Sequence, residues 1–176
     1  MSVDATKEKW MQWVALTTTV LAVCTAISTL KGGGYSTRVQ ILTVQETNTW
    51  GYFQAKSIKQ HIYEMQVDAF KLELIKPNTP ESTTYIEGKI KAYEEAVGKY
   101  EKEKTELKSE AEKIGKDSGA LKNHGGNFSM AAMFFQIGIM MSSVGALLKR
   151  RPLWIAGLLM GSIGMLYFAN GFWLFF

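Results

Sequence analysis

Residues 10–30 read WMQWVALTTTVLAVCTAISTL and contain no Asp, Glu, Lys or Arg. As a helix, this stretch rises about 30 Å at 1.5 Å per residue, which is the thickness of the hydrocarbon core of a bilayer. It therefore predicts a transmembrane helix. Two further runs, 128–148 and 153–176, also lack these charged residues and are long enough to span a membrane.

The charged residues gather between these runs. The formal net charge of +4 would be compatible with a nucleic-acid partner, but Lys and Glu alternate throughout residues 81–114. Such alternation is typical of a solvated helix surface and not of a basic patch. We therefore expect membrane lipid, and no nucleic acid, as a partner. Cys24 is the one cysteine and lies inside the first apolar run, so no intrachain disulfide can form.

Two long helices are expected in the charged middle. Spacings of four and three, typical of a coiled-coil seam, place one set of residues on one face of the helix 36–76. This first seam consists of Ile58, Ile62, Met65, Ala69 and Leu72. A second seam runs beside it through Tyr63, Val67, Phe70 and Leu74. Two adjacent seams indicate burial against more than one partner helix.

Pro77 and Pro80 should end the first of these helices. Thr79 is then expected to cap the next helix, with Pro80 and Glu81 in its first turn. The second helix, 81–114, carries one apolar stripe that is interrupted only by Lys104. The stripe runs through Ile86, Ile90, Tyr93, Val97, Tyr100, Lys104, Leu107, Ala111 and Ile114. Neither helix can bury its stripe alone, so the two should pack on each other or on further copies.

The sequence thus predicts an all-α membrane protein with three transmembrane helices, one N-terminal and two C-terminal, and a long extramembrane antiparallel coiled-coil helical hairpin. In chain order, the expected parts are an N-terminal tail 1–9, a transmembrane helix 10–30, a Gly hinge 31–35, a hairpin helix 36–76, a turn 77–80, a hairpin helix 81–114, a Gly-rich loop 115–127, a transmembrane helix 128–148, a basic loop 149–152 and a transmembrane helix 153–176.

The orientation follows from the basic residues. Cytoplasmic loops are enriched in Lys and Arg, which places the loop 149–152 in the cytoplasm. Three spans then put the N-terminus on the same side and the hairpin outside the cytoplasm, in a bacterial inner membrane. The opposite orientation stays open because basic residues also flank the spans on the hairpin side: Lys31, Arg38, Lys116 and Lys122.

Small residues recur at helical spacing on all three spans and permit the close approach by which helices associate in lipid. They are Ala15, Thr19, Ala22 and Ala26 on the first span, Gly138, Ser142 and Gly145 on the second, and Gly157, Gly161 and Gly164 on the third. Such faces predict packing, within one chain or in a homo-oligomer. A pore is the alternative, lined by Gln12, Thr17, Thr18 and Thr25, although rings of charged or amide groups are missing at mid-membrane depth.

His61, Glu64 and Asp68 share one helix face and are weak candidates for metal ligands. The same spacing is ordinary on a solvated helix, so we expect no metal and no cofactor. The sequence has no nucleophile motif, phosphate-binding glycine loop or paired-cysteine motif. We therefore expect a protein that is not an enzyme.

An aromatic group with two lysines lies at the expected membrane-proximal end of the first hairpin helix: Trp50, Tyr52, Phe53, Lys56 and Lys59. These residues could pack the base of the hairpin against the returning helix. Alternatively, aromatic rings beside lysines could dock a partner protein or lipid headgroups. The sequence leaves both interpretations open.

Four stretches carry a resemblance: KW at 9–10, ALTT at 15–18, LKGGGYS at 30–36 and WGYFQAKSIK at 50–59. They resemble a bacterial membrane-protein family catalogued as domain of unknown function 4337. The resemblance covers essentially the whole chain, including the order of the three spans. It implies a bacterial membrane protein and brings no activity with it.

From these features we expect a non-enzymatic membrane scaffold or interaction protein that forms homo-oligomers through its hairpin and its spans. One alternative is an accessory subunit of a larger membrane complex, such as a respiratory or transport complex. The other is a small channel or transport component.

Overall fold

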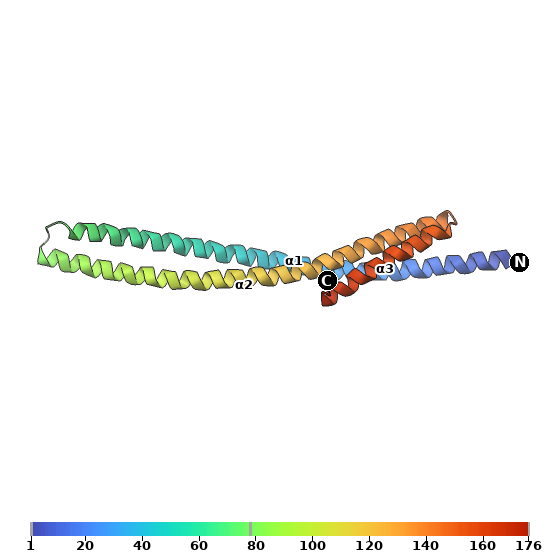
Figure 1. Ribbon diagram of the computed structural model, residues 1–176, viewed down its shortest axis with the longest axis horizontal. Coiled ribbons are helices and arrows are strands. Elements are labelled where there is room, and N and C mark those ends of the chain that lie inside the picture. Colours follow the sequence, from blue (N-terminus) through green and yellow to red (C-terminus); the bar gives the residue numbers. More distant parts are fainter. Residues whose placement is uncertain (1, 78, 176) are drawn as a thin grey trace. The chain divides into compact units, whose positions relative to one another are not determined.

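The computed structural model describes residues 2–77 and 79–175, with side chains from residue 10 onward (Figure 1). These residues form three helices, α1 (Ser2–Leu74), α2 (Pro80–Leu147) and α3 (Arg151–Trp173), and contain no strand. The prediction of an all-helical chain is confirmed. Each of the three helices contains a segment that is long and apolar enough to cross a membrane, judged by length and composition.

Both glycine-rich segments are helical, so the predicted hinge 31–35 and the predicted loop 115–127 are wrong. A Cβ atom on Gly32 would lie 3.4 Å from Phe128 Cβ, and one on Gly125 would lie 3.2 Å from Tyr35 Cβ. These glycines let two helix backbones approach closely. Helical hydrogen bonding continues through them because the turns on both sides are already helical, and extending an existing helix is far easier than starting one.

The turn between α1 and α2 agrees with the predicted capping. The backbone N–H of Ser82 donates to Thr79 Oγ1 at 3.4 Å. Pro80 is the first residue of α2, and Glu81 lies in the first turn. A proline suits this position because the first N–H groups of a helix have no partner within the helix.

The basic turn between α2 and α3 is shorter than predicted, because α3 already begins at Arg151. Lys149 adopts a left-handed conformation with a φ of 55°. The N–H of Arg150 then donates to the carbonyl oxygen of Gly145 at 2.9 Å. This bond satisfies one of the last carbonyl groups of α2 and reverses the chain.

The chain divides into two compact units. The apolar unit comprises Met1–Gln40 and Ser118–Phe176, and the charged unit comprises Ile41–Asp117. The apolar unit contains parts of all three helices. The charged unit contains one stretch of α1 and one stretch of α2.

In the apolar unit, α2 and α3 run side by side (Figure 1, orange and red). They touch through glycines. A Cβ atom on Gly138 would lie 2.8 Å from the carbonyl oxygen of Gly157. The Gly157 backbone is in turn covered by Ser142, whose side chain is fully buried. Contact at this distance is available only to residues without a side chain.

α1 joins this pair through a different face from its small residues. Leu21 is buried with Ala131 and Phe135, and its side chain lies against Gly161. Trp154 Nε1 donates to Thr17 Oγ1 at 3.2 Å, which joins α3 to α1. Leu21 of α1 therefore fills the space that Gly138 of α2 and Gly161 of α3 leave open.

We predict that Gly157→Ala lowers the free energy of unfolding by about 1–3 kcal/mol, because the new methyl group has no room beside Ser142 and the Gly138 carbonyl. Thermal unfolding of the full chain in mild detergent, followed by circular dichroism, would measure the change. The matched control is Gly33→Ala, since nothing lies within 4 Å of a Cβ atom there. The control should be neutral or stabilising by up to about 1 kcal/mol, and equal losses in both variants would contradict the proposed packing.

Candidate functional site

Within the charged unit, α1 has two different faces. Its stretch 41–74 lies beside residues 80–117 of α2, and the two stretches run in opposite directions (Figure 1). The face toward α2 is called the inner seam. Its residues follow spacings of four and three and are all buried or half-buried: Leu42, Glu46, Thr49, Phe53, Lys56, Gln60, Tyr63, Val67, Phe70 and Leu74.

The apolar part of the inner seam lies toward the turn. Val67 of α1 is buried together with Ile86 and Ile90 of α2. The ring of Tyr63 lies 5.3 Å from the ring of Tyr93, measured between centroids, and aromatic pairs at this distance attract one another beyond their burial of area. This part of the inner seam thus has its partner within the same chain.

Lys104, which interrupts the apolar stripe of α2, has partners on α1. Its Nζ donates to Gln60 Oε1 at 2.8 Å and lies 5.6 Å from the centroid of the Phe53 ring. Gln60 in turn donates from Nε2 to Glu64 Oε1 at 2.8 Å. A sliding of α2 along α1 would leave Lys104 without these partners, so the polar contacts favour one register.

An ion pair closes one side of the inner seam. Lys56 Nζ lies 2.6 Å from Glu103 Oε2. The hydrogen bond to Glu103 raises the pKa of Lys56 above its ordinary value of 10.5. The same bond lowers the pKa of Glu103 below its ordinary value of 4.5.

The opposite face of α1 is called the outer seam, and all of its residues are exposed. They follow strict spacings of three and four: Ile41, Val44, Asn48, Gly51, Ala55, Ile58, Ile62, Met65, Ala69 and Leu72. The large aliphatic members are between 51% and 71% exposed. At about 100° per residue the two seams lie roughly 150° apart around α1, so the prediction that they are adjacent is wrong.

The outer seam has no counterpart on α2. Over residues 80–117, all of whose side chains are described, Tyr85 is the one large hydrophobic residue that is exposed. The other large apolar side chains of this stretch belong to the face toward α1. The exposed apolar surface of the charged unit is therefore concentrated on α1.

The candidate docking residues divide between the two faces. Trp50 and Phe53 are half-buried, with ring centroids 5.5 Å apart, and Lys56 is bound to Glu103. Tyr52 and Lys59 are exposed and flank the outer seam. The structure thus does not gather these residues into one surface.

The small-residue faces of the apolar unit also divide. Gly138, Ser142, Gly145, Gly157, Gly161 and Gly164 are all buried in the contact of α2 with α3 and α1. On the α1 stretch 10–40, by contrast, Ala15, Thr19, Ala22 and Ala26 are exposed, and the buried residues are Val14, Leu21, Ser28 and Gly32.

The threonines among the candidate pore residues donate hydrogen bonds from their hydroxyl groups to backbone carbonyl oxygens of α1 itself. Thr18 Oγ1 donates to the carbonyl oxygen of Val14 at 2.9 Å, and Thr25 Oγ1 donates to that of Leu21 at 2.8 Å. Thr17 donates likewise to its own helix and accepts from Trp154. Gln12 is exposed.

The weak metal candidates do not form a ligand set. His61 Nδ1 lies 2.8 Å from Glu64 Oε2. Among the residues that the structure describes, no three His, Cys, Asp or Glu side chains are grouped so as to hold a metal ion. Asp68 therefore adds no third ligand to His61 and Glu64.

The Lys56–Glu103 pair predicts a pH dependence of stability. Because the pKa of Glu103 is lowered in the folded chain, its contribution is present above pH 4.5 and is lost as the pH falls through the lowered value. The raised pKa of Lys56 makes its contribution present below pH 10.5 and lost as the pH rises beyond that value.

We therefore expect Glu103→Gln to be destabilised relative to the wild type at neutral pH and to approach the wild type as the pH falls below 4.5 and through the lowered pKa of Glu103. Thermal unfolding of the full chain across this range would measure the difference. Glu106→Gln removes the same charge from an exposed position of the same helix and is the matched control. A wild-type advantage over Glu103→Gln that stays constant across this range would argue against the ion pair.

Comparison with known proteins identifies the family of this chain. The sequence matches the family described as "Domain of unknown function (DUF4337)" over residues 10–174. No curated protein and no solved structure matches the chain. Since the matched range includes nearly all of α1 and the whole of α2 and α3, the chain belongs to the DUF4337 family.

Proposed function

We propose that this chain is a non-enzymatic integral membrane protein that forms homo-oligomers and serves as a scaffold or interaction protein. The observation that carries the proposal is the outer seam, a regular apolar face of α1 whose residues from Ile41 to Leu72 are all exposed. A seam with this spacing is complementary to another helix that has the same spacing.

Insertion in a membrane is supported by the apolar unit. Residues 10–40 and 118–175 contain no Asp or Glu. The α1 stretch 10–30 exposes large apolar side chains along its length: Trp13, Leu16, Val20, Val23, Ile27 and Leu30. Such a surface is costly in water and ordinary in lipid. The charged unit would then be an antiparallel coiled-coil hairpin outside the bilayer.

For the orientation, the turn Lys149-Arg150-Arg151 favours a cytoplasmic position. The N-terminus would lie on the same side and the hairpin outside the cytoplasm, in a bacterial inner membrane.

A second copy of the chain is the partner that the outer seam fits best. From Gln45 to Gln66, the positions that flank the seam are Thr47, Gln54 and His61 on one side and Gln45, Tyr52, Lys59 and Gln66 on the other. Over this stretch Lys59 is the one formally charged flanking residue, and Asp68 and Glu73 flank the seam only at its end near the turn. Two identical seams would therefore repel each other little over most of their length. An unlike partner with a strongly charged face would find no complementary charges over this stretch.

The area of the outer seam is also sufficient. Aliphatic side chains of this size and exposure present on the order of 700 Å² per copy, close to the roughly 800 Å² that each partner contributes to a standard interface. Two copies in one membrane have the same orientation, so their α1 helices would pair in parallel and at equal height.

In that arrangement each seam residue meets its own counterpart. Asn48 would face Asn48 of a second copy, and the two amides can form a hydrogen bond only when the copies are in register. Any shift would bury an amide against aliphatic side chains, where its loss of hydration is not compensated. Asn48 is thus the residue that would select the in-register arrangement.

We predict that Ile62→Lys, which places a charge in the middle of the outer seam, converts the oligomer to monomer in mild detergent. Native mass spectrometry and sedimentation of the full chain would report the mass. The matched control is Ala92→Lys, an exposed position of α2 outside its apolar stripe, which should leave the oligomer intact. A monomeric wild type would overturn the proposed function, and stoichiometric foreign chains in preparations from native membranes would favour the accessory-subunit alternative.

The register is tested by cross-linking in a Cys24→Ala background. Met65→Cys should form a disulfide with Met65→Cys of a second copy but not with Leu72→Cys, because seven residues separate the two positions by about 10 Å along the helix. Adding Asn48→Leu should strengthen association and permit the mixed cross-link, since the residue that selects the register is gone. Mixed cross-links in the presence of Asn48 would contradict the in-register arrangement while leaving oligomer formation intact.

The orientation predicts that protease added to right-side-out vesicles cleaves the hairpin, for example near the exposed turn at Lys76. Mass spectrometry of the membrane-bound fragments would locate the cleavage. Protection of the hairpin in these vesicles, with cleavage in inverted vesicles, would reverse the orientation.

A further inference from the structure

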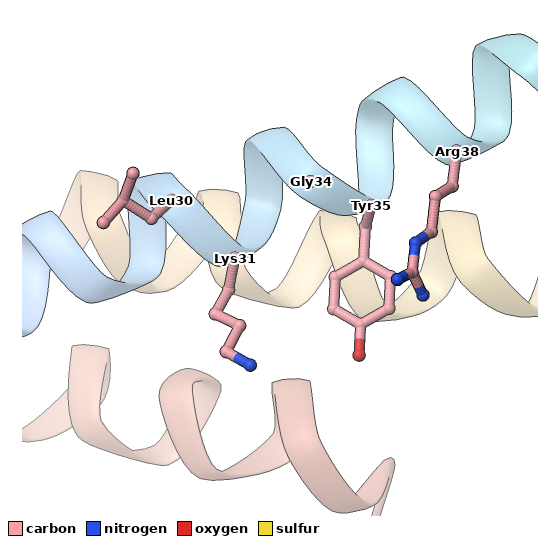
Figure 2. A pocket seen from close by; sticks show the side chains of 5 residues that line it. All are labelled: Leu30, Lys31, Gly34, Tyr35 and Arg38. Carbon is pink, nitrogen blue, oxygen red and sulfur yellow. The ribbon is translucent and has the colours of Figure 1, made fainter.

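A small pocket on α1 in the apolar unit carries two cationic side chains and a phenol. It has a volume of about 160 Å³ and is lined by Leu30, Lys31, Gly34, Tyr35 and Arg38. Lys31, Tyr35 and Arg38 are spaced by four and three residues and so share one face of the helix. Figure 2 shows the polar ends of these three side chains on the same side of α1.

The wall of the pocket is held in place by packing. The Tyr35 ring stacks on the His124 ring, with centroids 5.2 Å apart, and on the Phe128 ring at 5.8 Å. His124 Nδ1 donates to the carbonyl oxygen of Gly171 at 2.8 Å. Helices α2 and α3 therefore both help to fix the position of Tyr35, and its hydroxyl group is presented on a rigid support.

The two cations have no acidic partner in this unit. No ion pair joins Lys31 or Arg38 to a carboxylate among the described residues, and residues 10–40 and 118–175 contain no Asp or Glu. Lys31 Nζ lies 5.9 Å from the centroid of the Phe172 ring. Two cations on one face without a carboxylate leave an excess of positive charge at the pocket.

We propose that Lys31, Tyr35 and Arg38 form a binding site for a phosphate group. The guanidinium of Arg38 can donate two parallel hydrogen bonds to phosphate oxygens, Lys31 supplies a point charge, and the Tyr35 hydroxyl donates one bond. Gly34 keeps the floor of the pocket open, since nothing lies within 4 Å of a Cβ atom there. The volume is several times the roughly 30 Å³ of one water molecule, which is enough for a phosphate group.

The position of the site points to an anionic phospholipid as the source of the phosphate. Lys31 directly follows the apolar stretch 10–30, where lipid headgroups would lie if that stretch spans the membrane. This assignment to a lipid rests on the proposed membrane insertion but not on the formation of oligomers. Free inorganic phosphate shares the same chemistry and is distinguished by the experiment.

The experiment uses the delipidated full chain in mild detergent and native mass spectrometry. The probes are dioleoyl phosphatidylglycerol and dioleoylglycerol, which have the same acyl chains but differ in the phosphate headgroup. We expect the wild type to bind the phosphatidylglycerol selectively, and Lys31→Gln and Arg38→Gln each to weaken this binding about tenfold, the size of one lost charge-assisted hydrogen bond.

The matched control is Lys122→Gln, which removes one positive charge of the same unit from a position that does not line this pocket. It should change the affinity less than about twofold. Equal weakening by Lys122→Gln would overturn the site in favour of a general effect of charge. Unchanged binding of phosphatidylglycerol by Arg38→Gln would overturn it as well. Equal binding of dioleoylglycerol would overturn the assignment to a lipid headgroup.

Inorganic phosphate is tested by its effect on the melting temperature. A rise in the wild type that is absent in Arg38→Gln, without selective binding of phosphatidylglycerol, would support the phosphate site and assign it to free phosphate instead of a lipid. The same mass spectra report the oligomeric state, so a wild type that forms the oligomer but binds no phosphatidylglycerol and shows no stabilisation by phosphate would overturn this site without touching the proposed function.

Discussion

The packing of α1 against α2 along the inner seam determines what the rest of the charged unit can do. Val67 with Ile86 and Ile90 supplies the apolar part of this contact, and the bond from Lys104 to Gln60 sets its register. Once these contacts form, the orientation of α1 about its own axis is set, and the outer seam must point away from α2. A helix with apolar residues on two nearly opposite faces can satisfy only one of them with a single neighbour.

The two seams differ in chemistry, which explains why they cannot exchange roles. The inner seam contains aromatic rings, an amide and an ion pair that match particular groups on α2. Apart from Asn48 and Gly51, the outer seam consists of aliphatic side chains. Any helix that keeps the same spacing of three and four residues along its length could match it. Intrachain pairing is therefore selective, and the remaining face is suited to contact with an identical surface.

The sequence was sufficient for those features that depend on neighbours along the chain. Runs without charge predicted the apolar stretches, and Thr79-Pro80-Glu81 predicted the capped start of α2.

The sequence was not sufficient where the reason for a residue lies in a distant helix. Gly32 and Gly125 read as flexible joints, although they are small because α1 and α2 approach each other there. Periodicity likewise identified a small-residue face on α1, but not that Leu21 and Ser28, on another face, would be buried. Lys31 and Arg38 indicated orientation only, because their common pocket with Tyr35 requires the stack on His124.

Because the outer seam is exposed, the fraction of the protein that is assembled would depend on the number of copies present. Each copy can complete its inner seam alone, because the residues that meet are close in sequence on either side of one turn. A folded single copy would thus precede any assembly, and association would follow mass action. Confinement to a bilayer would make the relevant concentration a surface density. The assembled fraction would then rise with the number of copies per area of membrane, so that expression level itself would decide whether the outer seam faces water or a second chain.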